Sequence, residues 1–572
     1  GDITGRLQVE GPENDFMTLV DRLTVQAVEA ARSEQTGGGG ALPVPNMSAL
    51  TTESLPALRA YLEGERLWRQ SKLEAAIPQL EQATRLDSTF AMAHLRLSVL
   101  YSYALTGDGT ATDERAYQEQ ARERLKAARR HGNRLPPREK ALLSGEVAYQ
   151  LEGNQVKAAE ILKAAAQRFP TDPEIRSTYS MHLANPVTAW ATLGKAPEAN
   201  RTGFADTYLE YSRQALALDS TYTPPYYSLV ATAIARGDTT EARRLTDAYR
   251  RHAGGEDNRM IESLEGAYRL AYSDSIAQSA VLQGLRAGTY IRGGSGFIAA
   301  LARNPGASSL DALEQVGDVL VERGLYGWRT LARIFRGHYQ TASTFIQEET
   351  STSPSARLYR AWTSGILLQR NALSSEAIPD GVAAPLCTMD VYISYRTTGC
   401  FYHVILSEAA GDVTVREQAL NVLTQSETSL REEGDPEWAD VAEGYQLALD
   451  GIAALQDGNS DGHAMLDRAH IKLDAIVVAG GEFLPMEIQV GALVDAGEAE
   501  RALPYAEMIQ FFDPYGHYLE GRIHEVAGNP EAAREAYEAF TSAWRDADPD
   551  IAALEHAKAV LAGTPPAEAP PL

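Results

Sequence analysis

Small and apolar residues recur along this chain in one repeated order of spacings. A glycine is followed five positions on by alanine, then after four and three more positions by further small or apolar residues, and a proline, glycine or serine closes the set. Complete sets are Gly153, Ala158, Leu162, Ala165 and Pro170; Gly237, Ala242, Thr246, Tyr249 and Gly254; and Gly497, Ala502, Ala506, Ile509 and Pro514. Partial sets are Ala76, Leu80, Ala83 and Ser88, and Gly528, Ala533, Tyr537 and Phe540. Steps of three and four place residues on one face of a helix, so the pattern predicts helices almost throughout 51–563.

The order of these residues also predicts how the helices pair. A glycine turns the chain between two antiparallel helices, and the alanine lets the second helix approach the first closely. The apolar residue four positions on fills the space between them. One such hairpin cannot bury its own apolar face, so we expect hairpins to stack into an all-α solenoid.

The hairpin pattern resembles the tetratricopeptide repeat. The match is best over 57–90, 139–172, 223–256, 483–516 and 514–547, and it is weaker from 257 to 440. The resemblance implies a right-handed superhelix whose concave face binds a protein or peptide.

The two ends of the chain resemble the repeat region that follows a TolB-like domain in large bacterial proteins. Thr51–Gly64 is similar to the opening of that region, and Tyr537–Pro549 is similar to its closing repeat. Gly1–Ile3 and Phe16–Ala31 resemble the last strand and helix of the TolB-like domain. In those proteins a serine/threonine kinase or a DNA-binding module often precedes the TolB-like domain, although the kinase motifs themselves are absent from this sequence.

These resemblances and the positions of glycine and proline predict six segments. They are a TolB-like remnant (1–36), a Gly/Pro linker (37–50), a repeat array with insertions (51–256), degenerate helical repeats (257–440), C-terminal repeat units (441–563) and a disordered tail (564–572). One insertion is expected to begin at Gly107, and a second is expected to span 184–206. Because the sequence opens at Gly1 and not at a methionine, we interpret it as a processed chain or a piece of a longer one. Its first residues do not have the pattern of a secretory signal.

Charge narrows the classes of function. The 572 residues include 77 acidic and 52 basic side chains, for a formal net charge of −25. This acidity argues against a nucleic-acid partner, because phosphates would be repelled. Runs of about 18 apolar residues, which would span a membrane, are absent.

Two segments carry residues that could bind a metal, and each has a simpler interpretation. Asp457–Gly462 resembles the first half of a calcium loop, but Arg468 stands where the loop needs an acid, so a turn between helices is favoured. His517, Glu520 and His524 lie on one predicted helix, where we expect histidines packed between helices. We therefore predict that the chain has no metal site, no cofactor and no catalytic residues.

The two cysteines, Cys387 and Cys400, leave two alternatives open. They pair if the chain lies outside the cytoplasm and the fold brings them together, or they are two half-buried thiols. The compartment is open for the same reason.

The repeat pattern favours binding over catalysis. Their positions in the repeat predict that four side chains face the groove: Tyr227, Tyr515, Tyr518 and Arg522. Tyrosine and arginine are common interface anchors, so we expect these residues to bind the partner. The alternative is packing between helices, since Tyr515 shares a helical stripe with Leu519 and Ile523. Two other functions stay open: a sensory or regulatory region of a bacterial kinase or transcriptional regulator, and a structural protein that assembles with itself into filaments.

Overall fold

The computed structural model describes most of the chain from residue 52 onward. The described residues are Gln8 and the ranges 52–104, 111–152, 154–183, 204–253, 259–287, 295–302, 305–322, 327–378, 383–388, 393–432, 436–473 and 483–564. The predicted TolB-like remnant (apart from Gln8), the linker, most of both predicted insertions and the tail from 565 lie outside these ranges.

Helices and turns make up the described residues, and these residues contain no strand. They fall into two compact units, Gly1–Leu105 with Thr112–Val147 and Thr106–Ala111 with Ala148–Leu572. None of the described helices combines the length and the apolar character that crossing a bilayer requires.

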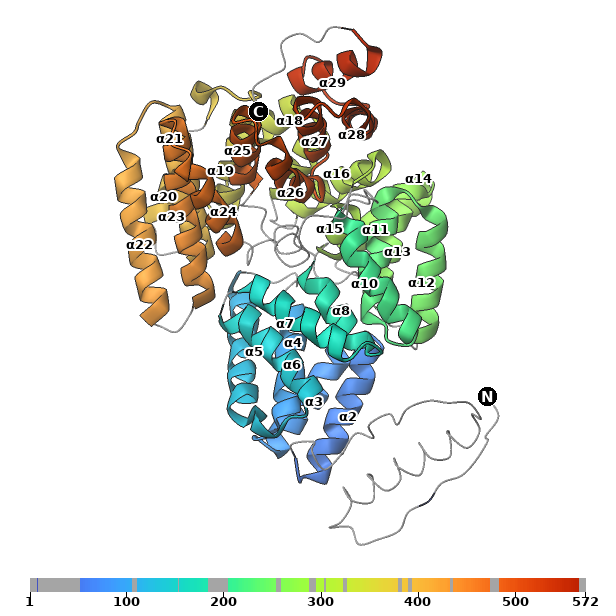
Figure 1. The fold of residues 1–572 in the computed structure, drawn as a ribbon. Coiled ribbons are helices and arrows are strands. Elements are labelled where there is room, and N and C mark those ends of the chain that lie inside the picture. Colours follow the sequence, from blue (N-terminus) through green and yellow to red (C-terminus); the bar gives the residue numbers. More distant parts are fainter. Residues whose placement is uncertain are drawn as a thin grey trace. The chain divides into compact units, whose positions relative to one another are not determined.

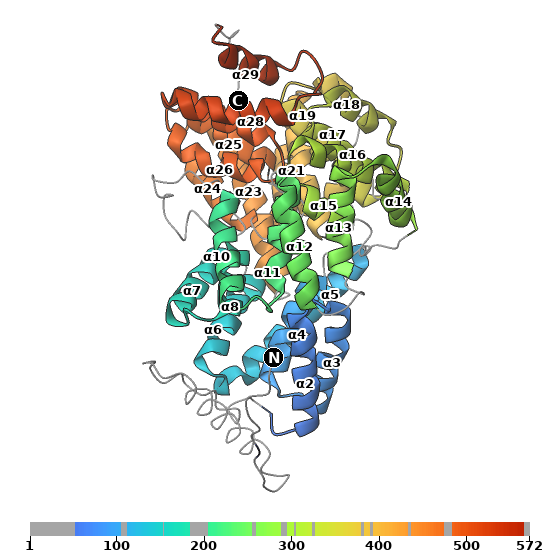
Figure 2. The ribbon, with the colours of Figure 1, turned by 90° about the vertical axis from the view of Figure 1, so that its right-hand side faces the viewer.

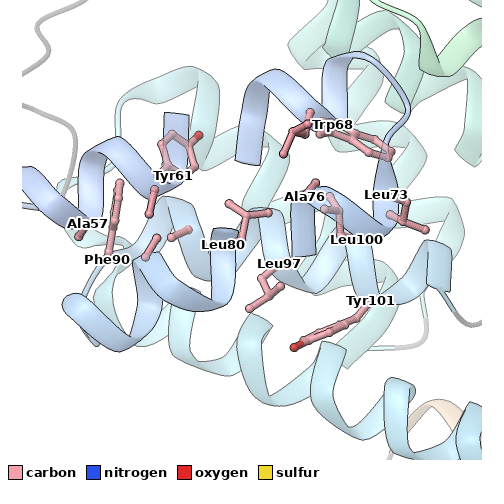
Figure 3. Packing of buried hydrophobic residues seen from close by; sticks show 14 of the residues in the cluster. Ala57, Tyr61, Trp68, Leu73, Ala76, Leu80, Phe90, Leu97, Leu100 and Tyr101 are labelled. Carbon is pink, nitrogen blue, oxygen red and sulfur yellow. The ribbon is translucent and has the colours of Figure 1, made fainter. Parts of the chain in front are cut away.

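The first unit is a set of helices, of which those between residues 57 and 121 share an apolar core. Its elements are α2 (Leu55–Arg69), α3 (Leu73–Leu86), α4 (Ala91–Ala104), α5 (Ala111–His131), the 3-10 turn η3 (Gly132–Arg134) and α6 (Pro137–Glu146). Helices α2 and α3 run side by side as a hairpin (Figure 2). Figure 3 shows Tyr61, Leu80 and Phe90 among the side chains that fill the core. A side chain larger than hydrogen at Gly64 would collide with Leu80, so glycine permits the close approach of α2 and α3.

The second unit contains the remaining helices (Figure 1). The π-helical turn η4 (Val147–Leu151) begins at the boundary between the units and precedes these helices. The helices are α7 (Gln155–Arg168), α8 (Pro173–His182), α10 (Phe204–Leu218), α11 (Pro224–Arg236), α12 (Thr239–Ala253), α13 (Arg259–Tyr272), α14 (Ser275–Arg286), α15 (Ser295–Ala302), α16 (Ala307–Glu322), α17 (Gly327–Phe335), α18 (Tyr339–Glu348), α19 (Pro354–Gln369), α20 (Ala384–Thr388), α21 (Ile393–Ala409), α22 (Val415–Glu432), α23 (Pro436–Gln456), α24 (Asp461–Leu473), α25 (Phe483–Asp495), α26 (Ala499–Gln510), α27 (Tyr515–Val526), α28 (Pro530–Ala543) and α29 (Ala552–Ala562). A 3-10 turn, η6 (Ser375–Ala377), lies between α19 and α20.

The spacing pattern predicts correctly which residues the second helices bury. The alanine and apolar positions of the pattern are buried in α3, α7, α26 and α28, as are the Ala242 and Tyr249 positions of α12. Gly237, Gly497 and Gly528, which precede three of these helices, adopt left-handed backbone conformations with φ of 78°, 75° and 74°. Glycine reaches that conformation without steric cost, which explains its place in the turn.

Hairpins in the second unit stack in a row. The first helix of each hairpin, meaning the one that comes earlier in the sequence, contacts the first helix of the next hairpin. Helix α17 packs on α19, α19 on α21, α21 on α23, α23 on α25, and α25 on α27. Figure 1 shows α21, α22 and α23 as neighbours within this stack. The described residues therefore form an all-helical array of stacked hairpins, as the sequence predicts.

The C-terminal helices also contact helices far earlier in the same unit. Helix α28 packs on α16, and α25 packs on α19. The Trp544 indole N–H, just past α28, donates to the Phe335 carbonyl at 2.8 Å. We call the paired segments 336–340 and 544–548 the clasp. Stacking of neighbouring hairpins alone does not predict these contacts.

Candidate functional site

The two tyrosines expected at the groove, Tyr515 and Tyr518, are core residues of the second unit. Tyr518 is 0% exposed and Tyr515 is 7% exposed. The prediction that they face a partner in an open groove is wrong, and the alternative of packing between helices is what the structure has. Both lie on α27, which packs against α25, α26 and α28 and so has little free face.

An aromatic cluster surrounds Tyr518. Its ring centroid lies 6.0 Å from Tyr537, 5.5 Å from Phe540 and 5.9 Å from His556. Gly521 on α27 makes room for the Tyr537 ring, which a larger side chain at that position would strike. This cluster holds α27 to α28 and α29 by apolar burial.

Arg522 and Tyr227 are half-buried. The Arg522 guanidinium donates to the Tyr518 hydroxyl at 3.4 Å, and its Nε lies 3.6 Å from a Glu525 carboxylate oxygen. Tyr227 lies on α11, away in sequence from the α27 cluster. A role for either residue in binding a partner stays a prediction.

Three buried charges meet beside Tyr515. The Arg370 guanidinium donates to Glu487 at 2.5 Å and to Asp513 at 2.7 Å. The three side chains are only 2%, 2% and 1% exposed. Arg370 also lies 4.0 Å above the Tyr515 ring centroid, which adds a cation–π contact. We call these residues the Arg370 cluster.

The Arg370 cluster joins four elements. Arg370 follows α19, Glu487 lies on α25, and Asp513 lies in the turn between α26 and α27. Tyr339, the first residue of α18, accepts from Arg370 at 3.3 Å through its hydroxyl. Sequence reasoning missed this cluster because its two ion pairs span 117 and 143 residues, and no local spacing marks them.

Electrostatics in the Arg370 cluster favour a structural role. Burial raises the pKa of Glu487 and of Asp513, and the attraction of Arg370 opposes that rise. Burial alone would lower the pKa of Arg370, but the two carboxylates raise it well above its usual range. Arg370 forms ion pairs with both carboxylates where solvent is excluded, and these ion pairs fix the positions of four elements.

His517, Glu520 and His524 form a second polar group on α27. Glu520 accepts from the Gln510 amide at 2.8 Å, and the His517 and His524 ring nitrogens lie 3.7 and 3.8 Å from its oxygens. Burial alone would raise the pKa of Glu520, but hydrogen bonds from His517, His524 and Gln510 lower it to about 2. Across the described ranges, no group of three or more His, Cys, Asp or Glu side chains is arranged to hold a metal.

The calcium-like segment Asp457–Gly462 forms the turn between α23 and α24 and the first two residues of α24. Gly458 has φ of 75°, and the Asn459 side chain accepts from the backbone N–H of Asp461 at 2.9 Å. These are the backbone reasons for which turns select glycine and asparagine.

Cys387 and Cys400 are joined by a disulfide bond. The two sulfurs are 2.06 Å apart and link α20 to α21. The compartment that this pairing would imply stays a prediction.

One small hollow lies between α17, α18 and α19. The Arg329 guanidinium lies over the Phe345 ring at 3.5 Å from its centroid. The cavity volume is about 10 Å³, which is room for about one water molecule and not for a substrate. Its lining residues are Gly327, Arg329, Thr330, Phe345, Glu349, Ala356, Tyr359 and Arg360.

Comparison with known proteins adds a distant structural likeness. No protein-family model and no curated protein matches the chain. Among solved structures, the tetratricopeptide-repeat domain of P58(IPK) is matched over 75% of this chain and 99% of that domain, with 15% sequence identity and a TM-score of 0.19. A TM-score this low does not establish a shared fold. The class of protein follows from the helix pairing itself: the described residues form an all-helical repeat protein.

Proposed function

We propose that this chain is a non-catalytic scaffold of tetratricopeptide type that binds a protein or peptide partner along its stacked hairpins. The observation that supports the proposal is the unbroken row of first helices, α17, α19, α21, α23, α25 and α27, each packed on the next. Helices aligned in this way offer a long surface of which each hairpin contributes one segment, and such surfaces suit extended partners.

The chemistry of the described residues supports binding over catalysis. The buried acids Glu487 and Asp513 are occupied by Arg370, and the hollow beside Phe345 has room for about one water. The net charge of −25 favours a basic partner, because opposite potentials speed encounter and suppress wrong partners.

Cross-linking can test where the partner lies. The chain has 77 acidic residues and only eight lysines, so an acid-reactive reagent reports on far more of its surface than an amine-reactive one. The full chain is incubated with a captured partner, cross-linked and digested, and the linked sites are identified by mass spectrometry. We expect the linked residues to gather on the first helices, such as α19, α21 and α23.

The second helices of the same hairpins are the internal control. Links confined to α18, α22, α24 and α26 would contradict the proposed surface. The predicted anchor Tyr227 lies on α11, outside this row of first helices, so its variant is a separate test. Tyr227→Ala should weaken capture about tenfold, whereas Tyr117→Ala, at an exposed tyrosine of the first unit, should leave capture unchanged.

The two other predicted functions have distinct outcomes in this experiment. Links between two copies of this chain, with light scattering that grows with concentration, would favour self-assembly. The regulatory alternative depends on the resemblance of residues 1–36, nearly all of which lie outside the described ranges.

A further inference from the structure

His338 stands at the centre of the clasp, between two hydrogen-bond acceptors. It occupies the turn before α18, and its Nδ1 lies 2.8 Å from a Glu314 carboxylate oxygen on α16. Its Nε2 lies 2.9 Å from the backbone carbonyl of Asp546, past the end of α28. One imidazole therefore bridges Glu314 on α16 and Asp546, which lies 208 residues beyond His338 in the sequence.

The two contacts set the number of protons that the ring must carry. A backbone carbonyl only accepts, and an ionised carboxylate only accepts. A neutral imidazole has one N–H and can satisfy one of them, whereas the imidazolium ion donates to both. Glu314 also lies 3.5 Å from the Arg333 guanidinium.

Charges from every element around His338 favour a further cation. Three arginines and five carboxylates surround the clasp, so the acids are in excess without a protonated histidine. From α16 come Asp311, Glu314 and Asp318; from α17 and its following turn Arg333 and Arg336; and from the segment past α28 Arg545, Asp546 and Asp548.

We propose that the clasp is a pH-sensitive latch in which protonated His338 fastens the end of α28 to α16–α18. In mildly acidic solution the imidazolium makes both bonds and the latch is tight. In mildly alkaline solution the ring loses one proton, one of its two acceptors loses its donor, and the latch loosens. The bonds of Asp548 to Gly337 and Gln340 then hold the two segments with less support.

The direction of the titration agrees with this geometry. The hydrogen bond to Glu314 raises the pKa of His338 above 6.5, with a smaller contribution from the Asp546 carbonyl, while burial and Arg336 oppose the rise. A histidine whose pKa is higher in the folded state stabilises that state fully below the unfolded value, near 6.5. This stabilisation is lost as the pH rises through the folded pKa.

Amide hydrogen exchange in the unaltered full chain tests the latch directly. The reporters are the N–H groups of Gln340 and Asp548, which bond across the clasp. We expect their protection, corrected for the intrinsic pH dependence of exchange, to fall about tenfold from pH 6 to pH 9, because a hydrogen bond to a charged group is lost. Protection that stays constant over this range overturns the proposal.

Two variants separate His338 from the other titrating groups. The melting temperature of the unaltered chain should exceed that of His338→Gln most at pH 6, and the difference should shrink towards pH 9. Glu314→Gln should abolish the pH dependence of protection at Gln340 and Asp548. The control His131→Gln, at an exposed histidine of the first unit, should leave the protection of Gln340 and Asp548, and its pH dependence, as in the unaltered chain. A pH-independent difference for His338→Gln contradicts the latch.

Discussion

Helices α25–α28 and helices α16–α19 belong to one compact unit but are held by different kinds of contact. In α25–α28, neighbours in sequence pack through small residues, as where Gly521 admits the Tyr537 ring. In α16–α19, many polar side chains have their partners more than a hundred residues away. Arg370 pairs with Glu487 and Asp513, and Arg336 pairs with Asp546. A region without a repeat signature can therefore have its place fixed by distant charges.

The largest expected effect comes from removing the cation of the Arg370 cluster. Arg370→Met leaves Glu487 and Asp513 buried without a partner, and we expect a loss of about 3–5 kcal/mol in the free energy of unfolding at pH 7. Urea denaturation followed by tryptophan fluorescence measures it. Because burial raises the pKa of both acids, their protonation should restore part of the stability as the pH falls from 7 to 5.

The triple variant Arg370→Met, Glu487→Gln, Asp513→Asn is the matched control. It removes all three charges together and should lose far less stability than Arg370→Met alone. A single variant as stable as the unaltered chain would show that distant charges do not hold α19 to α25, and the comparison would fail.

The disulfide is the second contact that supports the region without clear repeats. Cys387→Ser with Cys400→Ser opens a link across 13 residues, and we expect a loss of about 2–4 kcal/mol in the free energy of unfolding. Urea denaturation of the double variant measures this loss. Reducing agent should lower the stability of the unaltered chain by a similar amount and leave the double variant unchanged. An equal response of both proteins to reductant would contradict the role of the bond.

A smaller effect is expected where local packing holds the structure. In Gly521→Ala the new methyl group strikes the Tyr537 ring, and we expect a loss of about 1–2 kcal/mol in the free energy of unfolding, measured by urea denaturation. The double variant Gly521→Ala, Tyr537→Leu should recover part of that loss.

Gly497→Ala separates packing from backbone strain. No atom stands in the way of a side chain at Gly497, but its φ is 75°, so its cost of about 1 kcal/mol should be unaffected by Tyr537→Leu. Rescue of both alanine variants by Tyr537→Leu would show that the ring contact is not specific to Gly521.

The sequence predicts the contacts within each hairpin and misses the ion pairs between distant segments. The glycine, alanine and apolar spacing locates the turns at Gly237 and Gly497 and the buried faces of α3, α7, α26 and α28. These features depend on residues within one hairpin. The pairing of Arg370 with Asp513 depends on how many hairpins stack, which no window of sequence records.

The candidate site shows the same division. Tyr515 and Tyr518 have the residue type of an interface anchor, but α27 is packed against α25, α26 and α28, so both rings are buried. Residue type and repeat position indicate a helix face without stating whether another helix already covers it.

One bond of the clasp bears on how the chain is made. The backbone N–H of Gln340, in the first turn of α18, donates to the Asp548 carboxylate at 2.7 Å, whereas His338 at the helix start provides no capping side chain. During synthesis the ribosome must add 208 more residues before that carboxylate exists. Helix α18 is translated about midway through the second unit, yet its beginning is completed only when nearly all of that unit has emerged.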